Sequence, residues 1–130
     1  MFLDTSGLLC LHHRAEPFPS QASQFYQQAR VRLTHSHVLA EYVALAQVRR
    51  LPRPAVLSFV NDLTNNPDIQ TVWVDEPLHH KAMALLQARL DKTYSLCDAV
   101  SFILMREQAI EEALTTDRHF VQEGFRRLLE

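Results

Sequence analysis

Four acidic residues, Asp4, Glu41, Asp98 and Asp117, lie at or near predicted junctions between strands and helices. Carboxylates gathered in one place raise each other's pKa and oppose ionisation, so such a cluster needs a counter-charge. A divalent cation supplies it, and ligands that are all oxygen favour Mg²⁺ or Mn²⁺ over zinc. Such an ion can activate a bound water and stabilise the charge that develops on a phosphoryl group. The acids therefore predict phosphodiester hydrolysis, provided that the fold brings them together.

The elements that must position these acids alternate between strands and helices. The predicted strands span residues 1–4, 31–36, 69–74 and 113–116, with an edge strand at 127–129. A helical pattern begins near Leu8, and further predicted helices span residues 21–30 (with Ser20 as N-cap), 37–50, 54–65, 76–90 and 98–107. This alternation predicts an α/β sandwich with a mostly parallel sheet, and the length predicts a single domain over residues 1–130.

This layout gives each acid a place relative to the sheet. Asp4 and Asp117 close strands, Glu41 lies in the second turn of the helix that follows the second strand, and Asp98 opens a helix that is apolar almost all round. In open parallel sheets the ligand crevice lies at the carboxyl ends of the strands. All four acids can therefore meet in that crevice.

Each acid also has a local explanation. Asp4, Asp98 and Asp117 stand where a helix N-cap is expected, and Asp is a favoured N-cap residue. Glu41 lies at the edge of an apolar helix face, where a solvated glutamate is common. Asp75 also follows a strand, but Glu76-Pro77 directly after it makes helix capping the better interpretation, so we leave it out of the site.

The composition excludes several other classes of site. The chain has only two glycines, too few for a dinucleotide fingerprint, and Gly7 and Gly124 are too far apart for a phosphate-binding loop. Its two cysteines match neither a zinc knuckle nor a disulfide framework, which favours a cytoplasmic protein. Neither a signal peptide nor a membrane span is expected. The formal net charge of −2 offers no general attraction to phosphate backbones, so nucleic-acid binding must be local and metal-assisted.

The residues around the four acids resemble a known family. The motifs are Asp4-Thr5-Ser6-Gly7-Leu8-Leu9, Leu39-Ala40-Glu41, Leu96-Cys97-Asp98-Ala99 and Thr115-Thr116-Asp117-Arg118-His119-Phe120. Together they are similar to PIN-domain ribonucleases, especially the VapC-like toxins of type II toxin–antitoxin pairs. No single motif is specific, but the order and spacing of all four cover nearly the whole chain.

The resemblance implies a three-layer fold around a central parallel sheet and an endoribonuclease that depends on Mg²⁺ or Mn²⁺. Asp4 and Asp98 are then expected to be the nearest metal ligands, with Glu41 and Asp117 completing the site directly or through water. Ser6 and Thr115 occupy the positions of hydroxyls that orient these carboxylates, although Thr5 or Thr116 could substitute. The family also implies an RNA substrate, a homodimer and a small cognate antitoxin protein that blocks the acidic pocket.

The basic and aromatic residues carry weaker signals. Arg118 is either a solvated residue at a helix start or a phosphate contact beside the metal. Arg14, Arg49, Arg50 and Arg53 could line an RNA path, but scattered arginines are usually solvated surface. The histidine pairs at 12–13, 35/37 and 79–80 lack metal-ligand spacing and are expected at the surface or in capping positions. Core packing is the expected role of Tyr26, Tyr42, Trp73 and Tyr94.

A function of another class remains open. The same fold can act as a non-catalytic module that binds a partner protein, with the acids serving as helix caps or as a docking surface for arginines. A phosphatase that forms a covalent aspartyl intermediate is weaker, because Ser6 stands where a second acid is wanted. A receiver-type signalling domain is disfavoured as well, because the only lysines are Lys81 and Lys92.

Overall fold

A parallel sheet forms the centre of the molecule in the computed structural model, which describes residues 1–13 and 15–130. Within these residues the sheet has five strands in the order β3-β2-β1-β4-β5. All of its ladders are parallel. The strands are β1 (Phe2–Leu3), β2 (Leu33–His35), β3 (Gln70–Val72), β4 (Glu112–Leu114) and β5 (Arg126–Arg127). The predicted mostly parallel sheet and its edge strand are confirmed.

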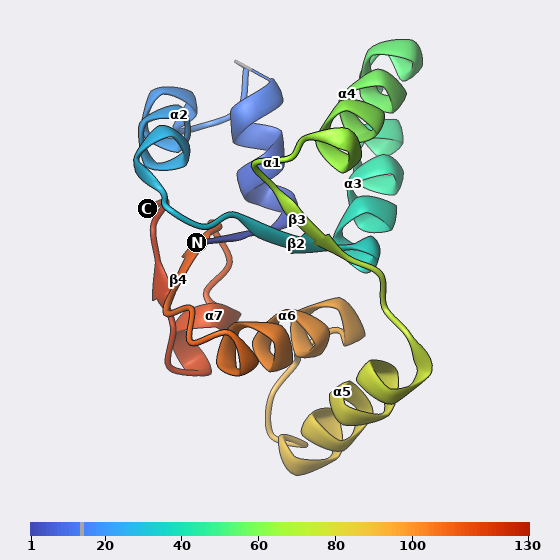
Figure 1. The fold of residues 1–130 in the computed structure, drawn as a ribbon, viewed down its shortest axis with the longest axis vertical. Helices are drawn as coiled ribbons and strands as arrows, with labels where there is room; N and C mark the ends of the chain where they lie inside the picture. Colours follow the sequence, from blue (N-terminus) through green and yellow to red (C-terminus); the bar gives the residue numbers. More distant parts are fainter. Residues whose placement is uncertain (14) are drawn as a thin grey trace.

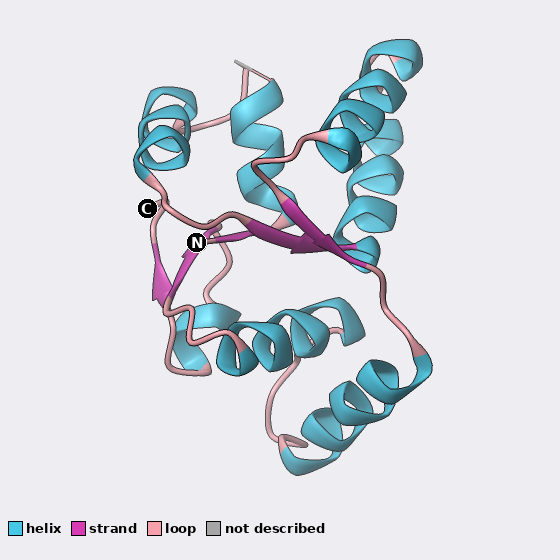
Figure 2. Ribbon diagram, in the orientation of Figure 1, coloured by secondary structure: helices cyan, strands magenta, loops and turns pink. Residues whose placement is uncertain are grey.

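Helices cover both faces of the sheet, giving three layers. They are α1 (Thr5–His12), α2 (Pro19–Gln28), α3 (Ser36–Val48), α4 (Arg53–Asn65), α5 (Glu76–Ala88), α6 (Leu96–Glu107) and α7 (His119–Gln122). Figure 1 shows α1 to α4 on one side of the sheet and α5 to α7 on the other. Figure 2 shows how short the strands are beside the helices that follow them. The predicted three-layer α/β fold is confirmed.

Two predicted helix starts are wrong. Helix α2 begins at Pro19, and its N-cap is Phe18, which has a φ of 64° and makes no side-chain capping bond. Ser20 therefore lies inside the first turn, where the Pro19 ring fixes the backbone for helix entry. Helix α6 begins at Leu96 after Ser95, two residues before the predicted start at Asp98. Asp75 caps α5 as expected, because its carboxylate accepts a hydrogen bond from the Leu78 backbone N–H.

The first turn of α1 lies directly against the end of β4. A Cβ atom at Gly7 would fall 2.0 Å from the carbonyl oxygen of Leu114, so only glycine fits there. The Asp4 backbone N–H donates to the same carbonyl at 3.3 Å. This close approach brings the end of β1 beside Thr115, the residue that follows β4.

A buried histidine joins α3 to α6. His35 is the N-cap of α3, where its Nδ1 accepts from the Val38 N–H. Its Nε2 lies 2.8 Å from the Ser101 hydroxyl, which donates in turn to the Cys97 carbonyl. Burial lowers the pKa of His35 to about 3, so the ring stays neutral at ordinary pH. Of the surface and capping roles expected for the histidines, His35 has the capping one while being buried, and it links the helices that bear Glu41 and Asp98.

Both cysteines, Cys10 and Cys97, are buried free thiols. Within the described ranges, every helix is too short or too polar to cross a lipid bilayer.

Candidate active site

Asp4 is a buried carboxylate at the carboxyl end of β1. The residue is 5% exposed, although it directly precedes a helix. Its side chain makes no capping hydrogen bond to α1, so helix capping does not explain it. Burial raises the pKa of Asp4 to about 7, and the charges of Asp98 and Glu41 add to the rise while a hydrogen bond from Thr115 opposes it. Asp4 is therefore held where ionisation is unfavourable, close to two other acids.

Two hydroxyl groups hold Asp4 in place. Thr115 Oγ1 donates to Asp4 Oδ2 at 2.7 Å, and it accepts from the Asp117 backbone N–H at 3.0 Å. Because the Thr115 proton is used on Asp4, the Ser6 hydroxyl at 3.1 Å must donate to Thr115. Ser6 Oγ accepts in turn from the Thr116 N–H at 3.0 Å. Ser6 and Thr115 thus occupy the orienting positions expected of them, whereas the buried Thr5 hydroxyl has no hydrogen-bond partner among the described residues.

Asp98 combines a local role with a place in the acid cluster. It is the third residue of α6, where its carboxylate accepts from the Ser95 N–H and its own N–H donates to the Ser95 hydroxyl. The two bonds form a capping box, so the capping interpretation is correct in part. Burial raises the pKa of Asp98 and the Asp117 charge adds to it, while the Ser95 N–H and His119 lower it. The same carboxylate therefore caps a helix and faces a second acid.

Asp117 lies in the turn between β4 and α7. Its Oδ1 accepts from the His119 backbone N–H at 2.9 Å, which fixes the turn locally. Its own N–H is bound by Thr115, the residue that also holds Asp4. One threonine therefore sets the positions of two of the predicted site acids.

Glu41 stays exposed on α3, as expected for a solvated glutamate. It nevertheless lies within electrostatic reach of the cluster, because its charge contributes to the raised pKa of Asp4. Burial is the main cause of the raised pKa of Cys97, and the charges of Glu41, Asp4 and Asp98 raise it further. Asp98 and Asp117 thus bring ligand atoms within 4.8 Å of each other, whereas Asp4 and Glu41 are not part of that close group. The charges of Asp98 and Glu41 nevertheless act on Asp4.

The residue that the sequence analysis missed is His119. Its Nδ1 lies 3.2 Å from Asp98 Oδ2 and 3.2 Å from Asp117 Oδ1. Ligand atoms of Asp98, Asp117 and His119 all lie within 4.8 Å of one another. The signal that could have found it is the Asp117-x-His119 spacing in the turn after a strand, where the capping interpretation concerned Asp117 alone.

The donor set of this cluster fits a divalent cation. Among the described residues, His119 is the only basic side chain within 4.0 Å of the Asp98 and Asp117 carboxylates, and Asp4 has no basic side chain that close. Several carboxylates therefore share one edge of the sheet without an arginine or lysine to neutralise them, and a cation relieves their mutual repulsion. Carboxylate oxygens are ligands that Mg²⁺ and Mn²⁺ accept.

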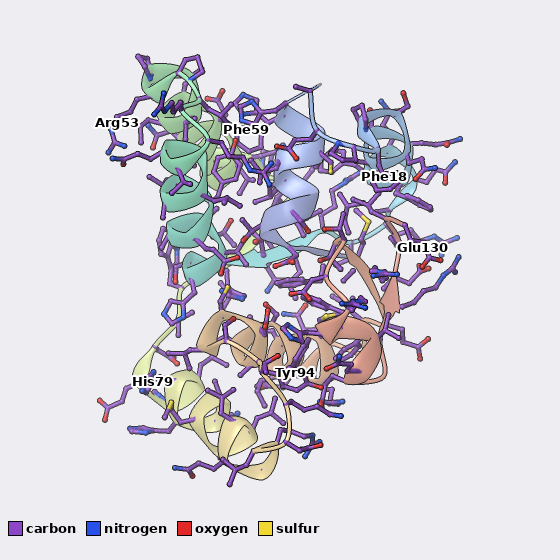
Figure 3. The ribbon with its side chains drawn as sticks, turned by 180° about the vertical axis from the view of Figure 1, so that it is seen from behind. Phe18, Arg53, Phe59, His79, Tyr94 and Glu130 are labelled. Atoms are coloured by element: carbon purple, nitrogen blue, oxygen red, sulfur yellow. The ribbon has the colours of Figure 1, made fainter. Side chains whose placement is uncertain are left out.

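Of the arginines singled out from the sequence, Arg118 lies next to this cluster, and Arg49 and Arg53 lie far from it. Arg118 is exposed directly beside Asp117. Arg49 pairs with Glu16, and Arg53 donates to Gln47, both at the far ends of α3 and α4. Figure 3 shows Arg53 well away from Tyr94, which precedes α6. Arg14, the other arginine considered for an RNA path, lies outside the described residues.

The aromatic residues mostly follow expectation. Tyr42 and Tyr94 are buried and Tyr26 packs against the core. Trp73 does not, because it is 64% exposed just after the edge strand β3. An edge strand has a free side, so an apolar residue after it need not reach the core. His12 and His13 both contact the Tyr42 hydroxyl, at 2.7 and 3.0 Å, rather than forming a metal site.

Comparisons with known proteins agree with this geometry. The sequence profile of the PIN domain family matches residues 1–125. The chain is 29% identical over 126 residues to "23S rRNA-specific endonuclease VapC20" of Mycobacterium tuberculosis, in strains CDC 1551 / Oshkosh and ATCC 25618 / H37Rv. The match covers 96% of this chain and 95% of that protein.

A solved structure is similar over the same span. The crystal structure of Mycobacterium tuberculosis VapC20, described as a sarcin-ricin loop cleaving toxin, has a TM-score of 0.88 against this chain at 25% identity. The alignment covers 99% of this chain and 98% of that one. The resemblance to VapC-like PIN-domain ribonucleases, drawn above from the four motifs, is confirmed.

Proposed function

Because this chain belongs to the PIN-domain family, we propose that it is a metal-dependent endoribonuclease, the toxin component of a toxin–antitoxin pair. It hydrolyses RNA phosphodiester bonds with a metal-activated water. The observation that carries the proposal is the buried Asp4 carboxylate, whose pKa is raised to about 7 beside Asp98 and Glu41. Groups whose pKa is strongly shifted by burial and by neighbouring charges cluster at functional sites.

Each site residue has a role in this proposal. Asp4 and Asp98 are the nearest ligands of an Mg²⁺ or Mn²⁺ ion, and Glu41 and Asp117 complete its surroundings directly or through water. When bound, the ion supplies a more acidic water and neutralises charge on the phosphate. Ser6 and Thr115 keep the Asp4 carboxylate oriented, which the hydrogen bonds at 2.7 and 3.1 Å support. Arg118, exposed beside Asp117, contacts a phosphate of the RNA.

The partners follow from the family and from the relatives found. VapC20 is named as specific for 23S rRNA, so we propose a ribosomal RNA substrate for this chain and 23S rRNA as the first to test. We further propose a homodimer, and a cognate antitoxin that covers the acidic pocket. Residues 1–130 act as one PIN-like domain in the cytoplasm, in line with a sheet that draws strands from both ends of the chain and with two free cysteines.

Cleavage of purified 23S rRNA in Mg²⁺ or Mn²⁺ tests the proposal. Asp98→Asn keeps the size of the side chain and should lower the cleavage rate by at least about 100-fold. Loss of a residue that only hydrogen-bonds to a metal ligand typically costs about 10–100-fold, and loss of a ligand itself should cost more. Asp75→Asn is the matched control, since Asp75 also accepts a backbone N–H at a helix start but lies outside the cluster. Undiminished cleavage by Asp98→Asn would show that Asp98 is not part of the active site.

One observation keeps a second function in view. Asp98 closes a capping box and Asp117 binds a backbone N–H, so both have structural roles that need no metal. A non-catalytic PIN-fold module that acts through protein binding would use them in this way. Calorimetry with Mn²⁺ separates the two functions: the nuclease predicts heat of binding that Asp98→Asn abolishes, and the binding module predicts none.

A further inference from the structure

We propose that His119 Nδ1 is itself a ligand of the divalent ion, together with the carboxylates of Asp98 and Asp117. The site then contains one nitrogen donor among its oxygens and binds Mn²⁺ in preference to Mg²⁺. This inference rests on the proposed function, and it deepens that function by assigning a residue and an ion preference that the four acids alone do not give.

The distance from His119 Nδ1 to each of the two carboxylates is that of neighbouring ligands around one ion. His119 Nδ1 is 3.2 Å from an oxygen of Asp98 and 3.2 Å from an oxygen of Asp117. In an octahedral site with bonds of about 2.1 Å, adjacent ligands are about 3 Å apart. Although both distances would also suit hydrogen bonds, the ring nitrogen points at neither oxygen well enough to form one, and this buried atom has no other partner among the described residues.

The rest of the ring is fixed as the ring of a metal-binding histidine usually is. Such histidines donate their second ring N–H to an oxygen, which sets the tautomer and leaves the lone pair on the ligating nitrogen. His119 Nε2 lies 2.8 Å from the Thr93 hydroxyl, a suitable acceptor. The ring also meets Tyr94 edge-on, with centroids 5.4 Å apart, and the Tyr94 hydroxyl donates to Glu123. Nδ1 is therefore held toward the two acids by contacts on its other sides.

The opposing interpretation is that His119 is a counter-cation. A protonated imidazole between two carboxylates would neutralise them in place of a metal ion. The two roles make opposite predictions, because a competing cation weakens metal binding whereas a ligand strengthens it. Removing His119 should therefore raise the affinity for Mn²⁺ if it is a counter-cation, and lower it if it is a ligand.

Pulsed electron paramagnetic resonance of bound Mn²⁺ is the direct test, and it uses the unmodified chain. A coordinated imidazole gives a ¹⁴N modulation that ligation by oxygen alone does not. We expect this modulation in the unmodified chain. If Mn²⁺ binds and Asp98→Asn removes that binding, yet no ¹⁴N modulation is seen, the His119 proposal is wrong while the proposed function stands. If the unmodified chain binds no Mn²⁺, the proposed metal dependence is wrong, and the proposed ligand role of His119 is wrong as well.

Affinities measured by calorimetry then test the ion preference. We expect His119→Gln to weaken Mn²⁺ binding by about 10-fold or more and Mg²⁺ binding by no more than about 3-fold, because imidazole favours transition ions over Mg²⁺. Thr93→Val, which leaves the ring in place but removes its hydroxyl partner, should weaken Mn²⁺ binding in the same direction by a smaller factor. Equal losses for both ions, unchanged affinities, or tighter Mn²⁺ binding by His119→Gln would each overturn the proposal. Circular dichroism and thermal melts confirm that each variant is folded.

Discussion

Asp4 and Glu123 are both buried carboxylates, at 5% and 7% exposure, but the protein treats them in opposite ways. The Glu123 carboxylate pairs with Arg89 Nε at 3.0 Å and with Arg106 Nη1 at 2.7 Å, and it accepts a hydrogen bond from the Tyr94 hydroxyl at 3.1 Å. Burial pushes the pKa of Glu123 up, yet the hydrogen bonds from Arg89, Arg106 and Tyr94 outweigh it, so the pKa is lowered. Its charge is thus neutralised from within the chain.

Asp4 has no such internal partner. It accepts a hydrogen bond from the Thr115 hydroxyl, and its charged neighbours are acids. Burial and the charges of these acids therefore raise its pKa. The same fold that supplies two arginines to Glu123 leaves Asp4 and Asp98 without one among the described residues. The contrast separates a carboxylate that stabilises the structure from a cluster that is complete only with an external cation.

Exchanging each carboxylate for its amide should give the largest difference between the two clusters. Asp4→Asn should lower RNA cleavage by at least about 100-fold, because a proposed metal ligand contributes more than an outer partner. Glu123→Gln should cleave at nearly the unmodified rate. Initial rates measured well below the melting temperature of both variants provide the test. A loss of cleavage in Glu123→Gln as large as in Asp4→Asn would contradict the assignment of Glu123 to structure and Asp4 to the active site.

The hydroxyl that orients Asp4 gives the next largest effect. Thr115→Val removes the donor to Asp4 and the acceptor for the Asp117 N–H, and should weaken Mn²⁺ binding by about 10–100-fold. Thr115→Ser keeps the hydroxyl and should lose little. The two dissociation constants, measured by calorimetry, decide the point, and equal losses in both variants would indicate packing rather than orientation.

Stability should respond to pH with opposite signs at the two acids. The pKa of Asp4 is about 7 in the folded chain and 3.8 unfolded, so the folded state holds an extra proton between these values and stability falls as pH rises. The lowered pKa of Glu123 gives stability that is present above its unfolded value of 4.5 and is lost in more acidic solution.

Urea unfolding in EDTA at pH 5 and pH 7.5 measures the Asp4 contribution. Between pH 5 and pH 7.5 the free energy of unfolding of the unmodified chain should fall relative to that of Asp4→Asn by about 1–3 kcal/mol. Asp4→Asn should therefore be the more stable protein at pH 7.5. Added Mn²⁺ should reverse the order by stabilising only the unmodified chain. A pH response unchanged by Asp4→Asn would show that the folded pKa of this carboxyl is not raised.

Removing the Glu123 charge should cost stability rather than activity. Glu123→Gln should lower the free energy of unfolding by about 1–2 kcal/mol, at the low end for a buried pair because both arginines can turn to solvent. Thermal melts should show a fall of a few degrees. Glu107→Gln at the end of α6, which breaks an exposed pair with Lys81 on α5, is the matched control and should change the melting temperature little.

The smallest effect is expected at Arg118. Arg118→Ala should raise the KM for RNA by about 3- to 10-fold and reduce the slope of log affinity against log salt by about one. Arg53→Ala, at the far end of α3 and α4, serves as the control for general charge. Equal changes in both variants would point to diffuse attraction rather than a phosphate contact beside Asp117.

The sequence predicted much of this arrangement because parallel strands impose a simple rule. Residues that end such strands gather at one edge of the sheet, so Asp4 and Asp117 could be assigned to the same crevice from the alternation of strands and helices alone. Asp98 was harder, because a helix start does not reveal whether a carboxylate caps its own helix, faces a cluster, or does both.

What the residues determined by themselves was the class of fold, the edge of the sheet that carries chemistry and the need for a counter-charge there. Tertiary structure decided the rest. Thr115 reaches Asp4 across 111 residues, and Arg89 reaches Glu123 across 34. His119 turns its Nδ1 toward Asp98 because Thr93 and Tyr94 hold the other sides of the ring. Side-chain direction in a turn and pairing between distant segments depend on packing, and local sequence patterns do not encode packing.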